Sequence, residues 1–172
     1  VGEVHLGGEP LRGRAVVDYQ KGNSFTDSIW NWEQTVYGAL DFDLSPDTTL
    51  GIGASNKRSN YQPYIIGLPR NSDGSRLDVS RSTYAGANWN RASGNQTSVY
   101  LDLEHRFDDA WKLKASVLGM YESNEAVYQF ITGEVSATSS PIFADYATDF
   151  QNHNLGLDVY LDGQFEGLGF KQ

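Results

Sequence analysis

The sequence predicts an all-β fold, in which antiparallel strands are long enough to cross a membrane as part of a barrel. Apolar and polar residues alternate strictly in three segments, at 36–44, 99–107 and 155–165. Successive side chains of a strand point to opposite faces, so this alternation makes one face apolar and the other polar. A tilted transmembrane strand needs about 9–11 residues. We therefore predict a segment of an antiparallel transmembrane β-barrel, apolar toward lipid and polar toward the lumen.

The first three strands are predicted at 11–20, 34–44 and 49–57. In the first, small and apolar residues alternate with charged ones, which puts Arg12 and Arg14 on the polar face. In the second, Asp41 and Asp43 separate Leu40, Phe42 and Leu44. In the third, Leu50, Ile52 and Ala54 share the apolar face. Each segment therefore presents one face to lipid and one to water.

The last three strands are predicted at 98–107, 111–122 and 153–165. Asp102 and Glu104 interrupt the apolar residues of the fourth, and Lys112 and Lys114 do the same in the fifth. The sixth carries Asp158 and other polar residues between leucines and a valine. The period of two in all three segments favours strands over helices.

The predicted connections alternate in length. Tight turns are expected at 45–48, where Pro46 holds the second turn position, and at 108–110. Long loops are expected at 21–33, 58–97 and 123–152. Aromatic residues lie near the strand ends: Phe42, Phe107, Trp111 and Phe165 near the short turns, and Tyr19, Trp32 and Tyr121 near the long loops. Two aromatic girdles, short periplasmic turns and long extracellular loops are typical of outer-membrane barrels.

Composition narrows the function classes. The 172 residues include no cysteine, and a net charge of -9 disfavours binding to nucleic acid. The mean hydropathy of -0.48 and the lack of a long apolar run exclude a transmembrane helix. The three histidines are far apart, and no residues have the spacing of a catalytic or metal site. We expect no enzyme activity, no metal site and no cofactor.

Six strands are too few to close a membrane barrel, because the smallest of these barrels has about 8. An open sheet edge in lipid would leave unpaired backbone groups. The chain also begins at Val1 without a signal segment and stops shortly after the sixth predicted strand. We therefore expect residues 1–172 to be part of a larger barrel, located in the outer membrane of a Gram-negative bacterium.

Several short motifs together resemble one family. They are Leu11-Arg12-Gly13-Arg14, Phe25-x-Asp27, the run from Tyr37 to Leu50, Gly67-Leu68-Pro69, Ser80-Arg81-x-x-Tyr84 followed by Trp89, and the run from His105 to Leu113. In this order and spacing they resemble the first barrel strands of TonB-dependent siderophore receptors, closest to the ferric pyoverdine and coprogen receptor branch. Many relatives carry an aromatic residue just before Gly-Leu-Pro, where this chain has Ile65 and Ile66.

The resemblance implies a barrel of about 22 strands filled by an N-terminal plug. Such a receptor imports ferric siderophores with energy relayed by the TonB complex, and iron enters only as part of that ligand. The plug and the C-terminal barrel strands are absent from this chain. The implied partners are a ferric siderophore, outer-membrane lipid and, through the plug, the TonB complex, and the full-length barrel is expected to be monomeric.

An aromatic and cationic cup at the extracellular end suits ferric siderophores, because these are large, rigid and often anionic. The candidate ligand-binding residues of the long loops are Trp30, Trp32, Tyr61, Tyr64, Arg70, Trp89 and Arg91. Each could instead belong to the girdle or pack one loop against another. Arg12 and Arg14 face the lumen on the first strand, where they either contact the plug or are simply hydrated.

Two alternatives from other classes stay open. One is a passive outer-membrane porin or structural barrel, and the other is a soluble carbohydrate-binding β-sandwich. Liposome swelling would favour a porin, since a plugged barrel does not leak. A cooperatively folded monomer that is soluble without detergent would favour the sandwich.

Overall fold

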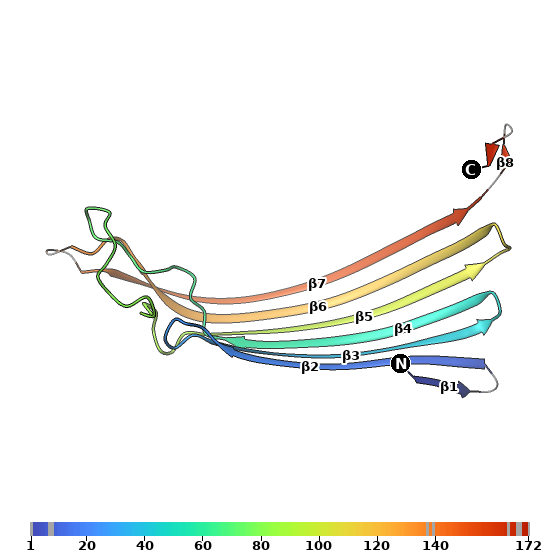
Figure 1. Ribbon diagram of the computed structural model, residues 1–172, viewed down its shortest axis with the longest axis horizontal. Helices are drawn as coiled ribbons and strands as arrows, with labels where there is room; N and C mark the ends of the chain where they lie inside the picture. Colours follow the sequence, from blue (N-terminus) through green and yellow to red (C-terminus); the bar gives the residue numbers. More distant parts are fainter. Residues whose placement is uncertain are drawn as a thin grey trace.

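One antiparallel sheet forms almost the whole computed structural model, which describes residues 2–6, 9–136, 138, 140–164, 166–167 and 170–171. Its strands, in chain order, are β1 (Gly2–Leu6), β2 (Glu9–Asn23), β3 (Trp30–Ser45), β4 (Thr48–Tyr61), β5 (Arg91–Arg106), β6 (Trp111–Thr132) and β7 (Ile142–Gly163). Short strands β8 (Glu166–Gly167) and β9 (Phe170–Lys171) pair separately. Consecutive strands lie side by side in a curved sheet (Figure 1). The all-β prediction and its six strands, β2 to β7, are confirmed. Among the described residues, no helix is long and apolar enough to span a membrane.

The strands extend further than predicted, and a strand lies before the first predicted one. β1 pairs with β2 although its five residues lie outside every predicted segment. β6 and β7 pair from Trp111 and Gly163 up to Thr132 and Ile142. The prediction of a loop at 123–152 is therefore wrong, because the connection between β6 and β7 occupies only 133–141. The loops predicted at 21–33 and 58–97 likewise shorten to 24–29 and 62–90.

Each face of the sheet has its own chemistry. The apolar face carries a cross-strand row in which Gly13, Leu40, Ile52, Leu101, Val117 and Leu157 lie opposite one another. The polar face carries the neighbouring row of Arg12, Asp41, Gly51, Asp102, Ser116 and Asp158. Leu157 is 73% exposed, and apart from glycines and Pro63 the only buried apolar residue in the described part of the chain is Ala92. The apolar face thus has no protein layer over it, as a lipid-facing wall requires.

The apolar band has a definite upper edge. On the apolar face of β7, the residues from His153 to Leu161 rise about 27 Å along the strand, comparable with the apolar band of roughly 25 Å in outer-membrane barrels. The next row up is Tyr19, Gln34, Arg58, Asn95, Ser123 and Gln151, which is mostly polar. Above this edge both faces of a strand meet water, so the alternation that reveals strands is lost. This is why the strand ends were predicted too short.

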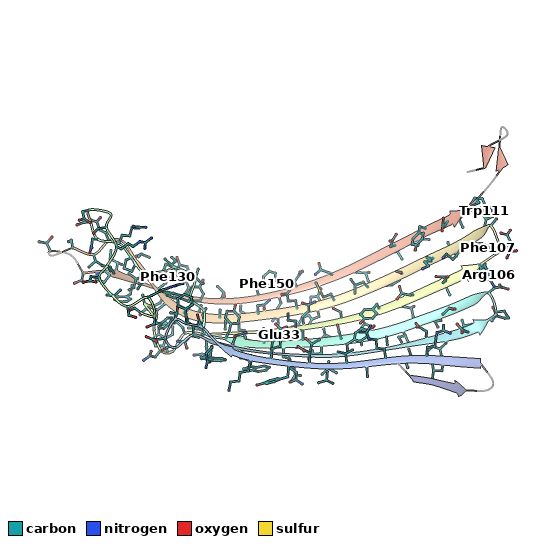
Figure 2. All side chains as sticks on the ribbon, viewed as in Figure 1. Glu33, Arg106, Phe107, Trp111, Phe130 and Phe150 are labelled. Atoms are coloured by element: carbon teal, nitrogen blue, oxygen red, sulfur yellow. The ribbon has the colours of Figure 1, made fainter. Side chains whose placement is uncertain are left out.

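The predicted short turns are confirmed at 46–47 and 107–110, and both lie at the same end of the sheet (Figure 1). Arg106 joins the first turn to β5 through an ion pair with Asp47 at 2.8 Å. In the second turn, Asp108 Oδ1 accepts hydrogen bonds from the backbone N–H groups of Ala110 and Trp111. Phe107 and Trp111 lie at this end (Figure 2), whereas Phe165 lies outside the described residues.

Candidate functional site

The polar face forms a wall of charged and hydroxylated side chains. Arg12 of β2 donates two hydrogen bonds to Asp43 of β3, at 2.5 and 2.8 Å, and Thr49 Oγ1 donates a third to the same carboxylate. Further along the sheet, Ser116 Oγ donates to Asp102 Oδ1 at 2.6 Å. Arg12 therefore has a partner within the wall itself. Contact of Arg12 and Arg14 with a plug stays a prediction.

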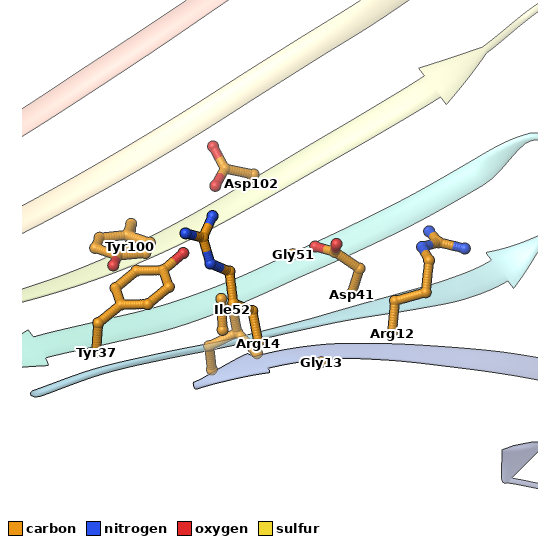
Figure 3. A pocket seen from close by; sticks show the side chains of 10 residues that line it. Arg12, Gly13, Arg14, Tyr37, Asp41, Gly51, Ile52, Tyr100 and Asp102 are labelled. Atoms are coloured by element: carbon orange, nitrogen blue, oxygen red, sulfur yellow. The ribbon is translucent and has the colours of Figure 1, made fainter. Parts of the chain in front are cut away.

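A shallow hollow of about 300 Å³ lies in this wall (Figure 3). Arg12, Arg14, Tyr37, Asp41 and Asp102 border it, and their side chains rise from the same side of the sheet (Figure 3). The hollow mixes both charges with phenol groups. It can therefore receive a polar side chain from whatever fills the space in front of the wall.

Glycines leave room for an aromatic pair beside this hollow. Tyr37 and Tyr100 stack with their ring centroids 6.0 Å apart. The Tyr100 ring lies over Gly53, its neighbour across β4 and β5, and a Cβ at residue 53 would overlap the ring. Glycine at this position therefore allows the ring to lie flat on the wall.

The longer connections meet at the other end of the sheet and form a loop cluster of 24–29, 62–90 and 133–136 (Figure 1). We call residues 62–90 the middle connection. Its Ser82 accepts a backbone hydrogen bond from the N–H of Asp27 at 2.7 Å and donates a hydrogen bond from its hydroxyl to the Asp27 carboxylate. On the other side, Ser72 and Arg70 pair with the backbone of Val135 at 3.0 and 2.9 Å. The middle connection is thus fastened to both of its neighbours.

Asn90 anchors the end of the middle connection. It is 4% exposed, and its side-chain amide bonds to both the N–H and the C=O of Gln129 in β6. The same amide donates to the hydroxyl of Tyr84 at 2.8 Å. Tyr84 in turn packs on Tyr64, with ring centroids 5.2 Å apart, and burial raises the pKa of the Tyr64 phenol. Tyr64, a predicted ligand residue, is therefore half-buried in the cluster, with its ring packed against Tyr84.

The other predicted ligand residues divide between the two faces and the loops. Tyr61 continues the polar face of β4 and is 43% exposed, while Trp89 lies at the end of the middle connection and is 44% exposed. By register, Trp30, Trp32 and Arg91 continue the apolar face above the band. The Trp32 ring stacks with Tyr19 at 6.4 Å, which fits the predicted aromatic girdle. Ligand contact stays a prediction for every one of these residues.

Arg70 borders a pocket within the loop cluster. The pocket has a volume of about 410 Å³, and Arg76 and Arg81 contribute two more guanidinium groups to its lining. Arg81 also lies over the Phe25 ring, 4.9 Å from its centroid. Leu68, Leu77 and Val79 supply apolar contacts. Three cations around apolar side chains suit a ligand with both an anionic and an apolar part.

An aromatic group on the β6–β7 hairpin was missed by the sequence analysis. We call Tyr128, Phe130 and Tyr146 the hairpin aromatics. Tyr146 stacks on Tyr128 at 5.8 Å and on Phe130 at 5.3 Å. They continue the polar face, as does Phe150 two rows nearer the short turns. Phe130 and Phe150 lie towards the loop end of the sheet (Figure 2). The spacing Tyr128-x-Phe130 was the available signal, but these residues fell in a segment predicted as loop.

Comparison with curated proteins finds relatives along almost the whole chain. Over 98% of its length, this chain is 38% identical to the ferric-pyoverdine receptor PbuA of a Pseudomonas strain. Over 92% of its length, it is 35% identical to the ferripyoverdine receptor of Pseudomonas aeruginosa. The chain spans about a fifth of the length of these relatives. No protein-family model matches it.

Solved structures show the same arrangement. The crystal structure of the outer-membrane ferripyoverdine receptor of Pseudomonas aeruginosa, bound to ferripyoverdine, matches with a TM-score of 0.86 and 32% identity. The match covers 94% of this chain and 22% of that receptor. The single sheet is therefore the same fold as a segment of that receptor, and the predicted barrel segment is confirmed.

Proposed function

The chain belongs to the TonB-dependent siderophore receptor family, and from that premise we propose that the receptor containing it imports a ferric siderophore of the pyoverdine class. Uptake would run across the outer membrane of a Gram-negative bacterium, through a plugged, monomeric barrel energised by the TonB complex. The observation that carries the proposal is the identity of 38% and 35% to ferric-pyoverdine receptors across nearly all of this chain.

The chemistry of the loop end supports this proposal. Tyr61 and the hairpin aromatics continue the face that becomes the lumen, and the pocket of Arg70, Arg76 and Arg81 lies in the loop cluster. Aromatic rings stack on a flat chromophore, and guanidinium groups pair with carboxylates or hydroxamates. Because the loop cluster is fastened by hydrogen bonds, little ordering is required when a large rigid ligand binds.

The polar wall supports the part of the proposal that concerns a plugged barrel. We assign the hollow bordered by Arg14, Tyr37 and Asp102 to contact with the plug, because it lies on the polar face below the loops. A plug that must move during transport needs polar contacts that can be replaced by water. A charged and hydroxylated wall provides them. No chemical step on the ligand is required of this chain.

Growth on ferric pyoverdine as the sole iron source tests the proposal. A strain lacking the full-length receptor gene should fail to grow, and should recover when the gene is restored. Recovery should also require an intact TonB complex. Growth that survives the loss of TonB, together with swelling of liposomes that contain the purified receptor, would instead show a passive porin. Recovery with unrelated ferric siderophores but not with pyoverdine would overturn the assigned ligand class.

A further inference from the structure

Three exposed cations continue the apolar face above its upper edge. They are Lys21 of β2, Arg58 of β4 and Arg91 of β5. Ion pairs among the described residues lie on the polar face or at a short turn: Arg12–Asp43, Lys57–Glu33, Arg106–Asp47, Lys112–Glu104 and Lys114–Glu104. The three outward cations take part in none of them. They therefore offer their charge to something outside the wall.

The register places these cations within reach of one headgroup. Arg58 lies two strands from Lys21 and one row below it, which separates their backbones by about 12 Å at a strand spacing of about 4.8 Å. Arg91 lies on the next strand, four residues above the position opposite Arg58. Long, flexible side chains at such distances can converge on two or more anionic groups of one molecule.

An apolar hollow lies below the cations on the same strands. Its volume is about 640 Å³, and small residues such as Ala15, Gly38 and Ala54 leave it open between Leu40 and Val99. From Ala54 to Arg58 the strand rises about 13 Å. The aromatic pair of Tyr19 and Trp32 lies at the level of the cations, since Tyr19 shares the row of Arg58 and Trp32 lies opposite Lys21, and amphipathic rings at this level sit beside lipid headgroups.

The same level of the neighbouring strands carries the opposite charge. Glu125 of β6 and Asp149 of β7 continue the apolar face above the band and lie opposite each other. A general ring of cations around the barrel is therefore not present on the described strands. This distribution of charge favours anionic lipid at β2–β5 over β6–β7.

We propose that the outward surface of β2–β5 is a binding site for the phosphorylated, multiply acylated glycolipid of the outer leaflet, lipid A. Lys21, Arg58 and Arg91 hold its phosphates, and the apolar hollow receives an acyl chain. Cations above an apolar hollow fit a phosphorylated lipid better than free phosphate, because free phosphate has no apolar part that could occupy the hollow. The site rests on the proposed orientation, in which the loop cluster is extracellular.

Native mass spectrometry of the full-length receptor, stripped of lipid in detergent, tests this site with lipid A as the probe. The triple variant Lys21→Gln, Arg58→Gln, Arg91→Gln should bind lipid A on the order of a hundredfold more weakly, about fivefold for each cation. Lys57→Gln is the matched control, since Lys57 is adjacent to Arg58 but points to the polar face. It should bind lipid A as the wild type does.

Two further measurements separate the parts of the site. Ala54→Phe fills the hollow and should weaken binding several-fold while leaving the three cations in place. Lipid A without its phosphates, and phosphatidylglycerol, should both compete poorly. Equal binding by the triple variant and the wild type, or equal competition by phosphatidylglycerol, would overturn the site. Ferric pyoverdine binding by the double variant Lys21→Gln, Arg58→Gln, which keeps the candidate ligand residue Arg91, should be unchanged, so a receptor that fails to bind pyoverdine at all contradicts the proposed function and not this site.

Discussion

The side chain of Asn90 pairs with the backbone of Gln129 as a neighbouring strand residue would. Its amide donates to the Gln129 carbonyl at 2.9 Å, and its carbonyl accepts from the Gln129 N–H at 2.8 Å. β5 begins at Arg91 opposite Val127, so the edge of β6 beyond Val127 has no strand partner on that side. Asn90 satisfies that edge and ties the middle connection to it.

Asn90→Ala should loosen the loop cluster without unfolding the barrel. The change removes the partners of two part-buried backbone groups of Gln129, at a cost of about 1–3 kcal/mol. Hydrogen exchange on the full-length receptor should show faster exchange in residues 62–90, with the strands below the cluster unchanged. Asn88→Ala is the control, because Asn88 is exposed in the same connection. Equal exchange in the two variants would show that Asn90 is not the anchor.

The two ends of the sheet should lie on opposite sides of the membrane. Ser72 lies in the loop cluster and Asp47 in a short turn at the other end (Figure 1). A cysteine at residue 72 should react with an impermeant maleimide on intact cells, and a cysteine at residue 47 should react only after the cells are opened. The reverse labelling pattern would invert the proposed orientation.

Charge should be tolerated on one face of β7 and rejected on the other. Leu157 lies in the middle row of the apolar face, and its neighbour Asp158 lies on the polar face. Leu157→Arg should lower the free energy of unfolding of the full-length barrel by roughly 2–4 kcal/mol, because it puts a charge in hydrocarbon. Asp158→Arg should cost much less. Urea unfolding in lipid vesicles measures both, and similar losses would mean that the faces are assigned wrongly.

Trp89 and Trp111 lie at opposite ends of the sheet and should have separable roles. Trp89→Ala should weaken binding of ferric pyoverdine about tenfold, by removing an exposed ring from the loop cluster. Surface expression should stay normal, because Trp89 lies outside the strands. Trp111→Ala should instead reduce surface expression and leave pyoverdine affinity unchanged, because the Trp111 indole lies against Gly163 across the β6–β7 pair. Normal binding by Trp89→Ala, together with loss of binding by a folded Trp111→Ala receptor, would contradict an extracellular ligand-binding cup.

The sequence predicted the fold wherever lipid imposes a pattern on it. Leu157 and Asp158 were placed on opposite faces from alternation alone, and the turn at Pro46 was placed from its residue types. Both follow from local chemistry. The pattern ended at Tyr121 and His153 because above them both faces of the hairpin meet water. The strand continued there because its backbone pairing needs no apolar side chains.

The candidate site was harder to predict for the same reason. Trp32 was recognised as an aromatic residue near a long loop, but its face depends on a register that extends beyond the alternating segment. Asn90 looked like an ordinary loop residue, since its partner Gln129 is 39 positions away. Tyr146 was assigned to a loop and not considered as part of a strand. Contacts between residues distant in sequence determine which side chains meet at the loop end of the sheet, and these contacts become evident only when the strands are paired.

The hairpin aromatics provide the sharpest test of the loop end. Tyr146 touches both Tyr128 and Phe130, and half of its surface is exposed. Tyr146→Ala removes two ring contacts within the hairpin and also a ring on the luminal face, whose stacking on a ligand chromophore is worth about 0.5–1.5 kcal/mol. Binding of ferric pyoverdine by the purified full-length receptor should therefore weaken about fivefold to tenfold.

Two companion variants decide why binding weakens. Tyr146→Phe keeps the ring and should bind nearly as the wild type, which shows that stacking and not the hydroxyl matters. Tyr121→Ala removes an aromatic contact from the opposite face of β6, where Tyr121 lies 4.8 Å from the His153 ring. It should lower barrel stability slightly and leave pyoverdine affinity unchanged. If Tyr121→Ala and Tyr146→Ala reduced affinity equally, the loss would come from a weaker hairpin, and the hairpin aromatics would have no direct part in binding.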